Sequence, residues 1–332
     1  MLFIVPRKFI VFSFAVILLT LVSGLRPLGL DGDSLNYVQI LDSRYPEINL
    51  FAKEPSFWLI NEFNHSFLSG HYTTFFLIFA LIGTFLKLLS IYKMSKAPYL
   101  SLLLYVFLYF ILHEMTQIRT GVAAGLFLLA INYYFNKDMR SYFLMILLAC
   151  LFHYSAILGL ILLLFKRDSF SPLNYALLLA SSFIFAFFNG GKSLSLISSF
   201  LPDFVALKLS LYMNLLESDR SWEINIFNYY YLSLIVISMF MILNHKRIKN
   251  KSDIFLLKIF VFGVASFYFL SSIPVIAFRV SEFYLVVSII LLANFSSVFK
   301  QKSLYISLIL TWGLTMFVLQ GIAKNINYEI LF

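Results

Sequence analysis

The chain has 332 residues, of which 61% are hydrophobic and only 12% are charged, and its mean hydropathy is +0.89. A soluble domain carries roughly 25% charged and 45–50% apolar residues, so this composition excludes a water-soluble globular fold, a disordered chain, a collagen and a nucleic-acid-binding domain. The single cysteine, Cys150, excludes a disulfide framework and any multi-cysteine metal site. The formal net charge of +9 is read by position, because membrane proteins place Lys and Arg on the cytoplasmic side. The composition predicts an all-α polytopic integral membrane protein.

A membrane-spanning helix needs about 20 mostly apolar residues. In chain order, the candidate spans are 9–25, 73–92, 98–114, 120–135, 172–188, 226–243, 254–272, 280–296 and 303–321. The first follows Arg7 and Lys8 as a signal peptide would, but its apolar run exceeds the usual ~7–15 residues. We therefore expect it to be a retained first helix.

The basic residues fix the expected orientation. Fourteen Lys and Arg against three acids fall in six segments taken as cytoplasmic: 1–8, 93–97, 136–140, 166–171, 244–253 and 297–302. The opposite side holds nine bases and thirteen acids, and Lys87 and Lys258 are expected to snorkel from cytoplasmic helix ends. This asymmetry predicts a multi-pass protein with a cytoplasmic N-terminus.

The segment 141–165 has 25 residues, which is long for one span and short for two. Both of its flanks are basic, so both are expected on the cytoplasmic side. We predict a hairpin of two short helices meeting at Phe152-His153-Tyr154-Ser155, with Ser155 capping the returning helix. Counting the hairpin gives about 10–11 membrane helices. The alternative is one tilted span, which would invert the orientation of everything after it.

Two long external loops are expected, at about 26–72 and 189–225, within a single transmembrane domain, 1–332. The first loop contains an amphipathic stretch after Glu54-Pro55, a pair that also suits an ordinary helix start. The second contains a similar stretch at 194–216. There is no convincing internal repeat, cytoplasmic domain or nucleotide-binding motif in the sequence.

Arg119 stands at an external helix start in Gln117-Ile-Arg119-Thr-Gly121. A boundary arginine costs several kcal/mol unless it is paired or wet. One interpretation is an outer-edge anchor paired with Glu114, and the other is a cation that grips a phosphate through its planar guanidinium. Gly121 and Gly125 have the GxxxG spacing that favours helix packing.

His153 and Arg279 have the same two kinds of interpretation. A lone histidine at a hairpin tip is a hydrogen-bonded structural residue or, because it titrates near neutrality, a general base. Arg279 and Glu282 are three residues apart, so they form a surface pair or a second phosphate-gripping cation with an acid that orients it.

No cofactor is expected, and the histidines lack metal-ligand spacing. Asp31 and Asp33 form an Asp-Gly-Asp that is ordinary turn chemistry, with a divalent cation as the weaker alternative. Tyr37, Trp58 and Tyr284 fit an interfacial aromatic belt, with stacking on sugar rings as the alternative.

Several of these sequence motifs, taken in their order along the chain, resemble those of a known family. The motifs are Asp33 with Tyr37, Glu54-Pro55, Gln117-Ile-Arg119-Thr-Gly121, Phe152-His153-Tyr154-Ser155-Ala156, and Phe278-Arg279 with Tyr284. This set resembles the EpsG-like branch of the Wzy-type O-antigen polymerases, although the chain has fewer clear periplasmic arginines than some of them. The resemblance implies a membrane-embedded, GT-C-like glycosyltransferase that polymerises polyprenyl-diphosphate-linked oligosaccharide repeat units on the outer face of the bacterial inner membrane.

On this resemblance, the expected catalytic residues are Arg119, His153 and Arg279, with Asp33 or Glu54 as the rival base. The expected substrate-binding residues are Asp33, Tyr37, Glu54, Gln117, Glu282 and Tyr284. Membrane lipid, a chain-length regulator and a flippase are the expected partners, and nucleic acid is not. The competing classes are a flippase for the same lipid-linked unit, a membrane O-acyltransferase acting on the glycan, and a ligase that uses the same donor.

Overall fold

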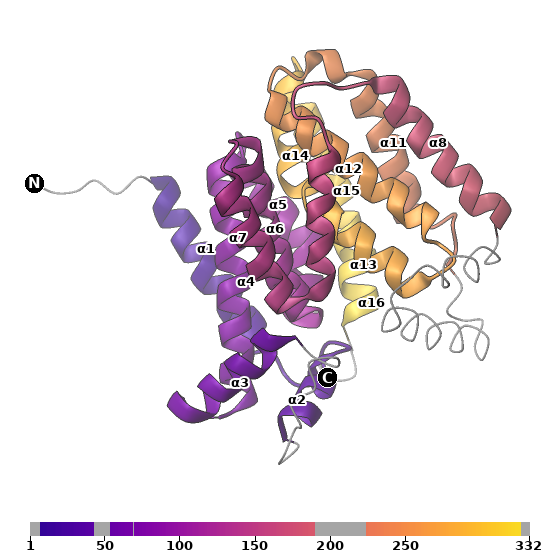
Figure 1. Cartoon of the computed structure of the whole chain (residues 1–332). Helices are drawn as coiled ribbons and strands as arrows, with labels where there is room; N and C mark the ends of the chain where they lie inside the picture. The colour runs from indigo at the N-terminus through magenta and orange to yellow at the C-terminus, as the bar shows by residue number, and fades with distance from the viewer. Residues whose placement is uncertain (1–6, 43–53, 69, 190–223, 327–332) are drawn as a thin grey trace, which may run out of the picture. The chain divides into compact units, whose positions relative to one another are not determined.

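The computed structural model describes residues 7–42, 54–68, 70–189 and 224–326, and these residues form helices without a strand. The chain forms two compact units by packing (Figure 1), and the single transmembrane domain stays a prediction. Unit 1 comprises residues 1–160 and 289–332, and unit 2 comprises residues 161–288. The amphipathic stretch predicted at 194–216 lies outside the described residues.

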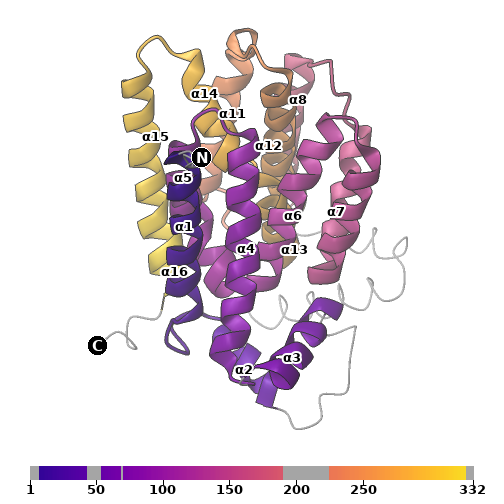
Figure 2. The same ribbon diagram turned by 90° about the vertical axis from the view of Figure 1, so that its left-hand side faces the viewer.

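Unit 1 is built around four adjacent helices, α1, α4, α6 and α7 (Figure 2). Its elements in chain order are α1 (Arg7–Gly24), α2 (Ser34–Asp42), α3 (Pro55–Phe67), α4 (Tyr72–Met94), α5 (Pro98–Tyr105), the π-helix η1 (Val106–Thr116), α6 (Ile118–Phe135), α7 (Met139–Phe152), the start of the 3₁₀ helix η2 (Tyr154–Leu164), α14 (Ser288–Phe295), η5 (Ser296–Val298), α15 (Lys302–Met316), η6 (Phe317–Ile322) and α16 (Ala323–Asn325).

Unit 2 is built around α12 (Lys251–Phe269), which packs against α8 (Pro172–Asn189), α11 (Tyr229–Leu243) and α13 (Pro274–Leu285). The short 3₁₀ helix η4 (His245–Arg247) joins α11 to α12. The ring of Tyr231 stacks on Phe267 at 3.4 Å between centroids, and its hydroxyl is 2.6 Å from the Ser281 hydroxyl. These contacts tie α11 and α13 to the central helix.

Six described helices are long and apolar enough to cross a membrane: Arg7–Gly24, Tyr72–Met94, Pro98–Thr116, Ile118–Phe135, Lys251–Phe269 and Lys302–Ile322. The other predicted segments appear as one bent pair, Pro274–Leu285 with Ser288–Val298, and as the shorter apolar helices Met139–Phe152, Tyr154–Leu164, Pro172–Phe188 and Tyr229–Leu243. The chain is thus an all-α, multi-pass membrane protein, as its composition predicts.

The predicted hairpin at 141–165 is confirmed. The first helix ends at Phe152, His153 adopts an extended conformation, and the second helix begins at Tyr154. The Tyr142 hydroxyl donates to the Gly159 carbonyl at 2.7 Å. These residues are 17 positions apart, and a straight helix would separate them by about 25 Å. The chain therefore turns back at His153, and the alternative of a single tilted span is wrong.

Two groups of polar residues lie at opposite ends of unit 1. At one end, Lys8 donates to the Tyr92 carbonyl at 3.2 Å, and the Lys93 ammonium lies 5.6 Å from the centre of the Tyr133 ring. At the other end, the first loop meets the break before α6 and the tip of the hairpin, and Glu54 contacts both Arg119 and His153. The predicted external residues of unit 1 therefore gather at a common end.

Glycines allow the helices of unit 1 to approach closely, as the GxxxG spacing predicts. A Cβ at Gly121 would lie 2.2 Å from the His113 carbonyl oxygen, and one at Gly125 would lie 2.8 Å from Cβ of Leu86. A Cβ at Gly83 would lie 2.2 Å from a Glu114 carboxylate oxygen. Side chains at these positions would force η1, α4 and α6 apart.

Substituting Gly121→Ala is expected to destabilise the protein by about 1–3 kcal/mol, because the new methyl group meets backbone that has no room to move. Thermal unfolding of the purified protein in detergent measures this. Gly32→Ala is the matched control, since a Cβ at Gly32 meets nothing within 4 Å. Equal unfolding temperatures for the two variants would contradict the close-packing interpretation.

Candidate functional site

Glu54 occupies the position before α3. Pro55 is the first helical residue, which its fixed φ and missing N–H favour. Glu54 itself is extended (φ −70°, ψ 157°), and its side chain does not cap the helix. The carboxylate is buried at 4% residue exposure and turns to two partners on other elements.

Arg119 is the first of these partners. The π-helix η1 ends at Thr116, and the backbone of the next residue, Gln117 (φ −95°, ψ 56°), breaks the run before α6 begins. Arg119 follows that break, and its Nη1 donates to Glu54 Oε2. The predicted pairing with Glu114 is wrong, because the Glu114 carboxylate pairs with Lys87 instead. In the described part of the chain, the buried Nε of Arg119 has no hydrogen-bond partner.

His153 is the second partner of Glu54. It lies at the hairpin break, where an extended backbone (φ −155°, ψ 118°) replaces the helix. Its Nδ1 is 2.8 Å from Glu54 Oε1, while its buried Nε2 has no partner among the described residues. A carboxylate on one ring nitrogen fixes the tautomer and leaves the other nitrogen to accept or deliver a proton.

Tyr37 completes the group. It lies on α2, is 4% exposed and stacks on Phe57 at 6.1 Å between ring centroids. The guanidinium carbon of Arg119 is 5.9 Å from the centre of the Tyr37 ring. Burial raises the pKa of the Tyr37 hydroxyl, despite the opposing charge of Arg119, so the phenol stays protonated at neutral pH. We call Tyr37, Glu54, Arg119 and His153 the Glu54 cluster.

Opposing effects act on the Glu54 carboxyl. Burial alone would raise its pKa, but the hydrogen bond from His153 and the positive charge of Arg119 outweigh burial and lower the pKa to about 2. The group is therefore an anion across the physiological range. An acid that is already ionised and bound on both oxygens is better suited to holding its partners than to taking up a proton.

This lowered pKa makes the cluster acid-sensitive. Because the folded pKa lies below the ordinary value of 4.5, the stabilisation is complete above about pH 4.5 and is lost as pH falls toward 2. The difference corresponds to about 3 kcal/mol. Unfolding in detergent, measured from pH 6 to pH 2.5, should show this loss in the wild-type protein and a smaller loss in Glu54→Gln. Parallel curves would contradict the assignment.

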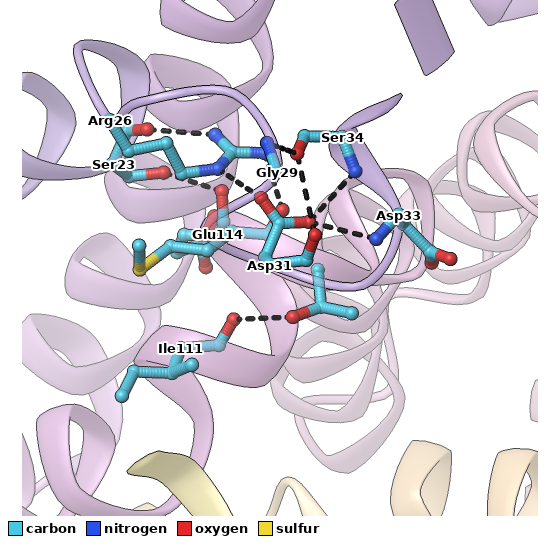
Figure 3. Close-up of polar contacts among 10 residues, drawn as sticks. Ser23, Arg26, Gly29, Asp31, Asp33, Ser34, Ile111 and Glu114 are labelled. Atoms are coloured by element: carbon cyan, nitrogen blue, oxygen red, sulfur yellow. Dashed lines mark hydrogen bonds and ion pairs between the residues drawn. The ribbon is translucent and has the colours of Figure 1, made fainter. Parts of the chain in front are cut away.

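The first loop is held in place by a second buried pair, Arg26 with Asp31 (Figure 3). Arg26 Nε donates to Asp31 Oδ2 at 2.6 Å, and its other nitrogens donate to the carbonyls of Ser23 and Met115. The second oxygen of Asp31 accepts from the backbone N–H groups of Asp33 and Ser34, both at 3.0 Å. Asp31 thus caps α2, the helix that carries Tyr37.

The Asp-Gly-Asp therefore serves the loop as a turn and a cap. Both carboxylate oxygens of Asp31 are engaged, one by Arg26 and the other by backbone donors. Within the described residues, no group of three or more His, Cys, Asp or Glu side chains is placed to hold a metal ion. Asp33 is half-buried, and its carbonyl accepts from the Tyr37 N–H at 3.0 Å.

The remaining predicted site residues lie in unit 2, on α13. This helix begins at Pro274, so Arg279 lies within the helix and not at its start as predicted. Arg279 is exposed and Glu282 is half-buried. Tyr284 is fully buried, with its ring 5.0 Å from that of Phe262, which is a packing environment.

Sequence reasoning missed a buried ionic group in the middle of unit 1. Lys87, 0% exposed, donates to Glu114 Oε1 at 2.5 Å and to the Gly121 carbonyl at 2.7 Å, and the Tyr105 hydroxyl donates to the same Glu114 oxygen at 2.9 Å. Lys87 is therefore a buried partner and does not snorkel as predicted. The available signal was a lone base and a lone acid in two neighbouring apolar helices.

Of three comparisons with known proteins, one found a match. No curated protein and no solved structure matches the chain, so the GT-C-like likeness stays a prediction. The EpsG family matches residues 9–330, nearly the whole chain. That family includes Wzy-like polymerases and is one of polysaccharide polymerase-like membrane proteins. The chain therefore belongs to the EpsG family.

Proposed function

We propose that the protein polymerises polyprenyl-diphosphate-linked oligosaccharide repeat units, of an O-antigen or a related surface polysaccharide, by glycosyl transfer. The observation that carries the proposal is the Glu54 cluster, in which one carboxylate holds both an arginine and a histidine whose Nε2 is buried and unpartnered among the described residues. A base fixed by an acid, beside a cation, suits transfer from a phosphorylated leaving group.

The reaction assigns one atom to each role. The donor is a growing glycan on polyprenyl diphosphate, and the acceptor is a sugar hydroxyl of an incoming lipid-linked unit. The acceptor oxygen forms a bond to the donor's anomeric carbon, while the bond from that carbon to the diphosphate oxygen breaks and leaves its electron pair on the diphosphate. His153 Nε2 takes the hydroxyl proton, and Arg119 stabilises the charge of the leaving diphosphate.

Glu54 acts as the positioning residue for both groups. Its Oε1 accepts from His153 Nδ1–H and so leaves Nε2 as the basic nitrogen, the arrangement that orients histidine in catalytic triads. Its Oε2 holds the guanidinium of Arg119. The rival role of Glu54 as base is disfavoured by its lowered pKa and by the engagement of both oxygens. Asp33 remains the other rival base, and Arg279 is kept as a second cation from the sequence pattern.

The proposed location is the periplasmic face of the bacterial inner membrane. The Glu54 cluster lies at the end of unit 1 away from Lys8 and Lys93, which belong to the basic segments that the positive-inside rule places in the cytoplasm. Polyprenyl-linked units presented outside the cell membrane would meet the cluster there.

A deletion strain complemented with the wild-type gene or with His153→Gln tests the proposal. The deletion should leave single repeat units on the lipid carrier, and the wild type should restore a ladder of long chains on a glycan gel. Loss of every surface unit would point to a ligase or a flippase instead, and a normal ladder with altered acylation would point to an O-acyltransferase. The His153→Gln variant should be expressed normally yet make only single units.

A further inference from the structure

The loop end of unit 2 contains a basic pocket that the proposed reaction does not use. It has a cavity volume of about 220 Å³, and its charged lining consists of Arg167, Asp168, His245, Lys246, Lys249 and Lys251. These residues come from the connection between η2 and α8, from the connection between α11 and α12, and from the first residue of α12, Lys251. We propose that this pocket binds the phosphate headgroup of an anionic phospholipid.

The charge of the pocket favours an anion. Four Lys and Arg side chains face one acid, and that acid, Asp168, is 3.0 Å from Lys251. In the described part of the chain, Lys246 and Lys249 form no ion pair. Clusters of Lys and Arg at the cytoplasmic membrane surface attract anionic lipid, with each base contributing about 1 kcal/mol. The excess positive charge is therefore concentrated in this pocket.

The pocket is built on a fixed support. Lys258 of α12 is 1% exposed, and its ammonium donates to the carbonyl oxygens of Lys166 and Ser169. These two bonds hold the loop that carries Arg167 and Asp168 against the helix. On the other side, His245 Nδ1 lies 2.8 Å from the Ile242 carbonyl, and the His245 ring is 5.4 Å from that of Phe170. The lining loops are thus anchored from both sides.

The surroundings favour a lipid over a free phosphate ion. Phe170, Ile248 and Ile254 also line the pocket, so its wall is partly apolar. The helices that lead into the two loops end with Leu164 and Leu243, which are 80% and 75% exposed. In a membrane protein, such exposed leucines face acyl chains, which places the bases at the height of the headgroups. Both loops belong to the segments expected in the cytoplasm, so the lipid would come from the inner leaflet.

Native mass spectrometry of the full-length protein, purified in detergent and mixed with phosphatidylglycerol or with zwitterionic phosphatidylethanolamine, tests the proposal. The wild type should retain phosphatidylglycerol in preference to phosphatidylethanolamine. The variant Lys246→Gln with Lys249→Gln should bind phosphatidylglycerol at least tenfold more weakly. The matched control, Lys300→Gln with Lys302→Gln, removes two exposed bases outside the pocket and should bind as the wild type does.

Equal binding by the two double variants would overturn the proposal. So would binding of inorganic diphosphate at the pocket without any preferential retention of phosphatidylglycerol, since the pocket would then serve a free phosphate. A thermal unfolding temperature equal to that of the wild type verifies that the pocket variant is folded. The proposal does not depend on the polymerase reaction, because its readout is lipid binding alone.

Discussion

Arg119→Ala is expected to abolish long polymer while leaving the protein at its normal level and single repeat units on the lipid carrier. Preorganised donors aimed at developing negative charge commonly contribute about 100- to 1,000-fold to a rate. Arg119 has the capacity for this role, because only part of its guanidinium is used by Glu54 and its buried Nε is unpartnered among the described residues. A diphosphate leaving group is expected to take up the donors that neither Glu54 nor Tyr37 uses.

Arg119→Lys tests the geometry of this contact apart from its charge. A lysine keeps the positive charge but has no planar fork with which to hold a carboxylate and a phosphate together, so it should restore little polymer. Arg140→Ala is the matched control, because Arg140 is an exposed arginine of unit 1 at the start of α7 and outside the Glu54 cluster. A ladder of normal chain length from Arg119→Ala would refute the phosphate contact.

The structural role of the Glu54–Arg119 pair needs a separate test, since removing one partner leaves a buried charge unpaired. The double variant Arg119→Met with Glu54→Gln removes both charges and should recover stability lost in either single variant. Under the proposed mechanism this double variant remains inactive as a polymerase although it is folded. Recovery of polymer together with stability would show that the pair only holds the loop to the helix.

The sequence predicted the helices of this protein far better than their polar contacts. The membrane spans could be predicted because a run of about 20 apolar residues forms a helix in a bilayer. The hairpin was readable because two basic flanks require the chain to return. The residues Glu54, Arg119 and His153 were also identified as candidates, each from its unusual type at its position.

The sequence did not predict which of these residues pair, and for Arg119 it predicted the wrong partner. Glu114 is five positions from Arg119, whereas Glu54 is 65 positions away, so local spacing favoured the wrong acid. Glu114 lies in the π-helix and pairs with Lys87, and no local sequence pattern predicts that pairing. Arg26 was missed for a similar reason, since its partners include the carbonyl of Met115, 89 positions further along the chain. Contacts between distant segments depend on packing that a single sequence does not display.

Lys87→Met is expected to destabilise the protein by about 3–5 kcal/mol, because it leaves the Glu114 carboxylate buried without its cation. The effect should appear as a lower unfolding temperature in detergent and a lower protein level in the membrane. Lys302→Met, at an exposed lysine of α15, removes the same charge and should change neither quantity. Equal unfolding temperatures for the two variants would contradict a buried ion pair.

The double variant Lys87→Met with Glu114→Gln separates stability from function at this pair. Replacing both charges of a buried pair is often neutral, so the double variant should regain most of the lost stability, with the Gln side chain still able to accept from the Tyr105 hydroxyl. Lys87 also donates to the Gly121 carbonyl, two residues after Arg119, so the pair fixes the first turn of α6. If that turn must hold Arg119 in place during transfer, the stable double variant will make shorter chains than the wild type. Polysaccharide chains of wild-type length would show that the Lys87–Glu114 pair contributes to folding alone.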